Sequence, residues 1–144
     1  MPRTIIQAAS LPAPPERLWA MYLSVDEHAA LTGFPVTIAP RAGAEFRAFN
    51  GAIWGSILDV VVNRLVVQQW RSKNFPQNAL DSTLVLSFWP EGAGGRIELV
   101  HANVPEEDFA GVSEGWSKFY WNPWRAYLDR TSESAAIAAG GSPA

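Results

Sequence analysis

At 144 residues, 48% of them hydrophobic and 17% charged, the chain has the length and composition of one folded domain, which excludes a disordered protein. A net charge of -3 without clustered Lys and Arg excludes a nucleic-acid-binding surface. The absence of cysteine excludes disulfides and cysteine metal sites, and it agrees with a reducing compartment.

The N-terminal part of the chain predicts one strand followed by two short helices. Residues 4–11 alternate loosely and stop at Pro12, which cannot donate to a sheet ladder. The two prolines that follow suit the first turn of a helix. Ser24 and Glu27 then form a capping box that begins a second helix, and Gly33 is expected to end it.

From residue 36 onward the hydrophobic pattern has a period of two and predicts an antiparallel meander. The Asn50-Gly51 dipeptide between residues 44–49 and 52–61 is a strong two-residue hairpin signal. Further strands are predicted over residues 64–71, 82–89 and 96–104.

The segment after residue 105 predicts a long helix crowded with aromatic rings. An acidic run over residues 106–108 suits the positive end of a helix dipole, and Pro123 is expected to bend the axis. One stripe of this helix holds Val112, Trp116, Phe119, Tyr120, Pro123 and Tyr127, and Trp121, Trp124 and Leu128 widen it, so we expect the helix to be mostly covered. From Thr131 the apolar periodicity stops, so we expect one domain over residues 1–130 and a disordered tail over residues 131–144.

Alternation along the strands assigns one set of side chains to the sheet face that meets this helix. A one-residue bulge would reverse the assignment for the earlier strands. The inward set comprises Trp54, Leu58 and Val60, then Val66, Gln68 and Trp70, then Leu84, Leu86 and Phe88, and finally Ile97, Leu99 and His101.

His101 is the inward-facing titratable residue with a near-neutral intrinsic pKa, so it is the candidate for proton transfer or a polar ligand contact. The alternative is a structural histidine that bonds Tyr120, Tyr127 or a backbone carbonyl. His28 is expected on a solvated helix surface. The carboxylates form no recognisable acid and base pair, and two separated histidines give no support for a metal site.

Short motifs in a fixed order run along the chain from Arg3 to about Leu128. They are Pro14-x-Glu16-x-Leu18-Trp19, Leu31-Thr32-Gly33, Phe49-x-Gly51 with Trp54 and Gly55, Val67-x-x-Trp70-Arg71, Ser82 with Leu84, Leu86 and Phe88, Leu99-x-His101, Val104-Pro105, and Gly115-Trp116-x-x-x-Tyr120-Trp121-x-Pro123-Trp124-x-x-Tyr127-Leu128. In this order the chain resembles the START-like (SRPBCC) superfamily, and more closely its branch of activators of heat-shock-protein-90 ATPase homologues. The resemblance implies an α+β helix-grip fold: a curved antiparallel sheet of about six strands wrapped around a long C-terminal helix, with two short helices after the first strand.

We expect a non-enzymatic domain that binds a small hydrophobic or aromatic molecule in a cavity between the sheet and the last helix, without a cofactor or metal. The candidate ligand-binding residues are Trp54, Gln68, Trp70, Leu86, Phe88, Leu99, His101, Trp116, Tyr120 and Tyr127.

Two alternatives stay open. The resemblance implies a chaperone-associated interaction protein, with self-association as a related option. Some START-like relatives are polyketide cyclases or aromatases, and an enzyme of that kind would depend on His101 here. No apolar run approaches the ~20 residues of a spanning helix and no signal segment is visible, so we predict a cytoplasmic protein that does not enter a membrane.

Overall fold

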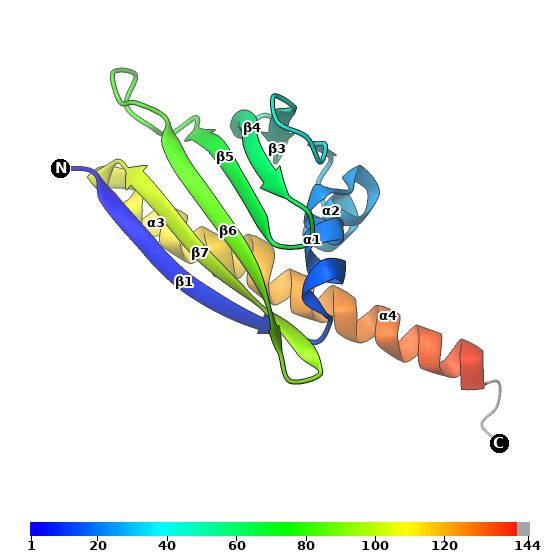
Figure 1. Ribbon diagram of the computed structural model, residues 1–144. Helices are drawn as coiled ribbons and strands as arrows, with labels where there is room; N and C mark the ends of the chain where they lie inside the picture. Colours follow the sequence, from blue (N-terminus) through cyan, green and yellow to red (C-terminus); the bar gives the residue numbers. More distant parts are fainter. Residues whose placement is uncertain (141–144) are drawn as a thin grey trace.

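The computed structural model describes residues 1–140, with side chains described through residue 132 (Figure 1). Its centre is a seven-stranded antiparallel sheet with the strand order β1-β7-β6-β5-β4-β3-β2. The strands are β1 (Arg3–Leu11), β2 (Val36–Thr37), β3 (Glu45–Ala48), β4 (Ile53–Val61), β5 (Leu65–Ser72), β6 (Ser82–Glu91) and β7 (Gly94–Val104). The sequence predicted about six strands, and the difference is the two-residue edge strand β2.

Two short helices, α1 (Pro15–Leu23) and α2 (Val25–Thr32), follow β1 as predicted. The Ser24 hydroxyl accepts a hydrogen bond from the Glu27 backbone N–H at 3.2 Å, which caps α2. Gly33 ends α2 in the left-handed conformation, with φ of 84°. α1 packs against β6 and β7, and α2 packs against the last helix.

The C-terminal segment lies across one face of the sheet (Figure 1). It comprises a short 3-10 turn η1 (Glu106–Asp108), α3 (Phe109–Trp116), a π-helical turn η2 (Ser117–Trp121) and α4 (Asn122–Gly140). The curved sheet and this long segment form the helix-grip arrangement that the resemblance predicts.

The π-helical turn changes which rings are buried. The sequence predicted one helix bent at Pro123, whereas the Asn122 N–H bonds the carbonyl of Ser117, five residues back, and Pro123 follows in the first turn of α4. The wider turn inserts one residue into the helical repeat. The buried set is Trp116, Tyr120, Trp121, Trp124 and Leu128, all of which belong to the predicted apolar face. The prediction was wrong for Phe119, which is exposed.

α4 continues to Gly140, which differs from the expected tail. The segment from Ser134 to Ala139 is rich in alanine, the residue with the highest helix propensity, which favours this continuation of the helix. Residues 141–144 of the expected tail lie outside the described residues.

The predicted facing is confirmed for β5, β6 and β7, whose inward residues are all buried. In β4 it was wrong for Trp54 and Leu58, which are 39% and 47% exposed while Ile57 is buried, and right for Val60, which packs against the core. A register shift between Ile57 and Asp59 leaves Leu58 as an extra, unpaired residue, which returns Val60 to the inner face.

The β3–β4 connection is also longer than predicted. The strands end at Ala48 and resume at Ile53, which leaves a four-residue loop in place of a two-residue turn. Phe49, Asn50 and Gly51 all have positive φ, of 53°, 57° and 87°. Asn and Gly tolerate this conformation, but at Phe49 it costs about 1–2 kcal/mol.

Candidate binding site

A pocket of about 380 Å³ opens between α3, η2 and the ends of β4 and β5. Its volume falls within the range of roughly 300–1,000 Å³ that is usual for small-molecule sites. Rings dominate the lining: Phe34, Phe49, Trp70, Trp116, Phe119 and Tyr120.

Phe49 occupies the centre of this ring cluster. Its ring centroid lies 5.3 Å from that of Phe34, 5.5 Å from that of Phe119 and 5.8 Å from that of Tyr120. These separations are those of favourable aromatic pairs. Phe49 thus combines a positive φ with a side chain that points into the pocket.

α3 presents little side-chain bulk to the pocket, because Gly111 and Gly115 are among the lining residues. They are four residues apart and so share one helix face. A Cβ built on Gly111 meets no atom within 4 Å, and one on Gly115 meets only the Phe119 ring, at 3.7 Å. Each glycine costs α3 about 1 kcal/mol relative to alanine.

Asp108 also lines the pocket, at the residue before α3. Its side chain makes no capping hydrogen bond, and its buried Oδ2 has no hydrogen-bond partner among the described residues. Burial, assisted by the neighbouring charge of Glu107, raises the pKa of the Asp108 carboxyl above its usual value.

Behind the pocket, Tyr120 connects to a buried histidine. The prediction for His28 was wrong, since it is 1% exposed and its Nε2 lies 2.8 Å from the Tyr120 hydroxyl. Nδ1 lies 2.6 Å from the backbone carbonyl of Tyr22, so Nδ1 carries the proton and the Tyr120 hydroxyl donates to Nε2. His28 stands three residues before the buried Leu31, and this helical spacing is the sequence signal that reveals its inward position.

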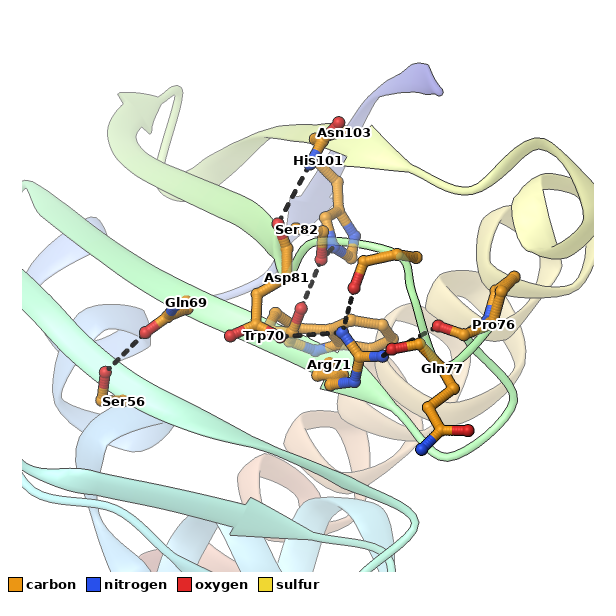
Figure 2. A network of polar contacts seen from close by, with 11 residues as sticks. Ser56, Gln69, Trp70, Arg71, Pro76, Gln77, Asp81, Ser82, His101 and Asn103 are labelled. Atoms are coloured by element: carbon orange, nitrogen blue, oxygen red, sulfur yellow. Dashed lines mark hydrogen bonds and ion pairs between the residues drawn. The ribbon is translucent and has the colours of Figure 1, made fainter. Parts of the chain in front are cut away.

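His101 is fully buried, and each of its ring nitrogens has a partner. The Trp116 indole N–H donates to Nδ1 at 3.2 Å, and the Nε2–H donates to the Ser82 hydroxyl at 2.8 Å. Ser82 in turn donates to the Trp70 carbonyl at 2.6 Å, as Figure 2 shows. These partners differ from Tyr120, Tyr127 and the backbone carbonyl considered from the sequence.

His101 is buried in its neutral form. Burial lowers its pKa to about 3, so the ring is neutral near pH 7. Both nitrogens are occupied within the protein, and His101 therefore offers no free lone pair to the pocket. It joins α3 to β5, β6 and β7.

Arg71 holds the loop between β5 and β6 through a separate group of contacts, beside the His101 chain in Figure 2. Its guanidinium donates to the carbonyls of Pro76 at 2.9 Å and Ala79 at 2.7 Å, and it pairs with Asp81 at 3.1 Å. The Phe75 ring centroid lies 5.7 Å away. Lys73, two residues after Arg71, is the cation among the residues that line the pocket.

The structure brings three of the predicted ligand-binding residues to the pocket, namely Trp70, Trp116 and Tyr120. Gln68, Leu86, Phe88, Leu99 and His101 are fully buried among the core residues instead. Trp54 lies on the opposite sheet face, and Tyr127 is half-buried on α4 beyond the π-helical turn. Sequence reasoning missed Phe34, Phe49, Asp108 and the two glycines, although glycine at helical spacing was a visible signal.

The outer face of the sheet carries a second feature, a row of aliphatic residues in register across four strands. Ile6 pairs with Val100, Val100 with Val85, and Val85 with Val67. Ile6 is 76% exposed. This aliphatic row leaves apolar surface in solvent on the face away from the helices.

Among the described side chains, no three His, Asp or Glu residues are grouped so that they could hold a metal ion. Within residues 1–140, none of the helices combines the length and apolarity needed to cross a bilayer.

A protein-family model described as "Activator of Hsp90 ATPase homolog 1-like protein" matches residues 12–129. The activator of 90 kDa heat shock protein ATPase homolog 1 of Homo sapiens is 23% identical over 107 residues, which cover 74% of this chain and 31% of that protein. The chain thus spans about a third of the length of the curated relatives it matches.

Solved structures share the fold, and two of them serve as examples. One is an HSP90 activator from Plasmodium falciparum, with a TM-score of 0.78 at 18% identity, covering 88% of this chain and 96% of that one. The other is the Aha1 dimer from Colwellia psychrerythraea, with a TM-score of 0.70 at 17% identity, covering 81% and 90%.

Proposed function

The chain belongs to the family of proteins like activator of Hsp90 ATPase homolog 1, and within that family we propose that it is a binding domain for a small apolar, ring-bearing molecule. The observation that carries the proposal is the pocket of about 380 Å³ whose lining is dominated by aromatic rings. Apolar pockets with a few convergent polar groups are the usual form of small-molecule sites. Here they include the side chains of Asp108, Ser72, Lys73 and Asn74.

The buried histidines support binding more than proton transfer. The cyclase-like alternative depended on His101, whose ring nitrogens are engaged by Trp116 and Ser82. His28 is engaged likewise by Tyr22 and Tyr120. Our proposal therefore assigns both rings to holding the walls of the pocket.

A ligand screen tests this function directly. We would incubate the full chain with fatty acids, alkyl alcohols and mono- and polycyclic aromatic compounds, and measure binding by native mass spectrometry and thermal shift. Phe119→Ala removes an exposed ring from the pocket lining and is expected to weaken binding of any hit at least several-fold. Trp89→Ala removes an exposed ring outside the lining and should leave binding unchanged.

Failure of the whole screen would refute the proposed function. So would a hit whose affinity is the same for the wild-type chain, Phe119→Ala and Trp89→Ala, because such a ligand would bind elsewhere.

A second candidate function is association with an Hsp90-type chaperone. It is supported by the names of the human relative and of the Plasmodium structure, and by the exposed aliphatic row on the outer sheet face. Ile6→Asp places a charge at the β1 end of that row, on its most exposed residue, and should abolish chaperone binding without changing the pocket. Calorimetry with the cognate chaperone measures this, and light scattering on the chain alone tests self-association. No heat of binding with the wild-type chain would remove this candidate.

A further inference from the structure

The two pocket glycines of α3 have no role inside the folded chain. Neither has a positive φ, so neither is required by the backbone. Neither makes a close approach to another segment, since a Cβ at Gly111 meets nothing within 4 Å and one at Gly115 meets only the Phe119 ring, at 3.7 Å. Alanine would fit at both positions and would favour the helix. What the glycines provide is open space over a bare stretch of helix backbone.

Asp108 lies on the same side of the segment. The spacing of Asp108, Gly111 and Gly115 is i, i+3 and i+7, which places all three on one helical face. An Asp that precedes a helix usually caps it, but this carboxylate does not, and its buried Oδ2 has no partner among the described residues. A buried acceptor without a donor is rare in folded proteins.

Rings close the pocket around this face. Trp116 and Phe119 extend from the same helical segment, and Trp70 lies on β5. Trp70 and Trp116 have ring centroids 6.5 Å apart. A ligand that lies along the glycine face therefore meets rings at its edges and a flat backbone surface beneath it.

From this arrangement we infer that the ligand is a flat, fused aromatic molecule that lies over Gly111 and Gly115 and donates a hydrogen bond from a hydroxyl or amino group to the carboxylate of Asp108. The inference rests on the proposed small-molecule function and specifies its ligand class. Flat rings fit where a methyl group would intrude, and the polar donor satisfies the buried Oδ2 of Asp108, which the described residues leave without a partner.

The test uses two probes with the same ring system. The probe 2-naphthol has a hydrogen-bond donor, whereas 2-methoxynaphthalene has the same rings and oxygen without the donor. Fluorescence or calorimetric titration of the full chain should give roughly tenfold tighter binding of 2-naphthol, as expected for a hydrogen bond to a charged acceptor. Asp108→Ala should remove this difference and leave the affinity for 2-methoxynaphthalene unchanged.

In the glycine variants we expect ligand affinity to fall while thermal stability rises. Gly111→Ala and Gly115→Ala should each weaken both probes several-fold and at the same time raise the melting temperature by about 2–3 °C, because alanine favours the helix while its methyl group fills the ligand space. Glu114→Ala, an exposed position of α3 outside the lining, is the control and should leave both affinities unchanged.

Equal binding of the two probes to the wild-type chain would overturn the inference, as would undiminished binding to Gly111→Ala and Gly115→Ala. Absence of binding by both naphthalenes would overturn it too. The proposed function would survive each of these results if alkyl or single-ring compounds bind in the wider screen, so the two failures are distinguishable.

Discussion

Acidification is expected to destabilise the fold through its two buried histidines. Burial lowers the pKa of His28 to about 4 and that of His101 to about 3, whereas an exposed histidine titrates near 6.5. In the interval between these values the unfolded chain binds protons that the folded chain does not. The stabilisation is therefore fully present above about pH 6.5 and is lost as the pH falls toward 4 for His28 and 3 for His101.

The size of the effect follows from the number of protons. Each group changes the free energy of unfolding by up to about 1.4 kcal/mol per pH unit where only the unfolded state is protonated. Between about pH 6 and pH 5 both histidines satisfy this condition over most of the interval, so together they should lower the free energy of unfolding by about 2 kcal/mol. His28→Gln and His101→Gln each remove one titrating group and should leave about half of this slope.

Urea denaturation at closely spaced pH values measures the slope for the wild-type chain and both variants. Where a variant fails to fold, NMR titration of the wild-type imidazoles gives the same information, because neither ring should titrate between about pH 7 and pH 5. A wild-type slope retained in both variants, or imidazole signals that titrate near 6.5 in the folded chain, would refute the assignment of two neutral buried histidines.

Three further substitutions test the fold by urea denaturation. Ser82→Ala leaves the buried Nε2–H of His101 unsatisfied and should lower the free energy of unfolding by about 1–3 kcal/mol. The control Ser56→Ala, on the outer sheet face, should change it by less than about 0.5 kcal/mol. Equal effects of the two substitutions would contradict the buried network. Gly33→Ala should cost about 1 kcal/mol or more because φ there is 84°, and a neutral result would argue against the left-handed cap. Gly55→Ala places a Cβ against the backbone carbonyl of Gln69 and should cost about 3 kcal/mol or abolish folding; a stable variant would mean that β4 and β5 are not paired as described.

The sequence predicted those features that depend on residues close together in the chain, such as the ends of α2 and the buried faces of β6 and β7. Ser24 and Glu27 mark the start of α2 because the cap is made between residues three apart, and Gly33 marks its end because few other residues adopt a left-handed conformation. The alternation along β6 and β7 was sufficient to identify their buried faces, because no bulge interrupts the pairing of these two strands.

The errors came from single inserted residues and from contacts distant in sequence. The extra residue Leu58 reverses part of β4, and no propensity distinguishes it from its aliphatic neighbours. The π-helical turn shifts the rings that follow it by one position. His28 is buried against Tyr120, which lies 92 residues further along the chain. The local sequence of α2 contains no sign of that partner.

The pocket was the least predictable part. Its rings come from the loop after α2, the β3–β4 loop, β5 and the C-terminal segment, which the fold alone brings together. The sequence indicated an excess of aromatic rings and a contact between the last helix and the sheet. From it, Trp70, Trp116 and Tyr120 were predicted to bind a ligand, and all three line the pocket. Their role in binding stays a prediction until the titrations are made.

The pairing of β1 with β7 has a consequence for how the chain folds as it is synthesised. Arg3 lies opposite Val104, and the Gln7 side chain accepts from the Trp121 indole, 114 residues further along the chain. Contacts at such high contact order close large loops and slow the folding reaction. On the ribosome, the nascent first strand therefore has no strand partner until β7 has left the exit tunnel, while the meander from β3 to β6 already has its own neighbours available.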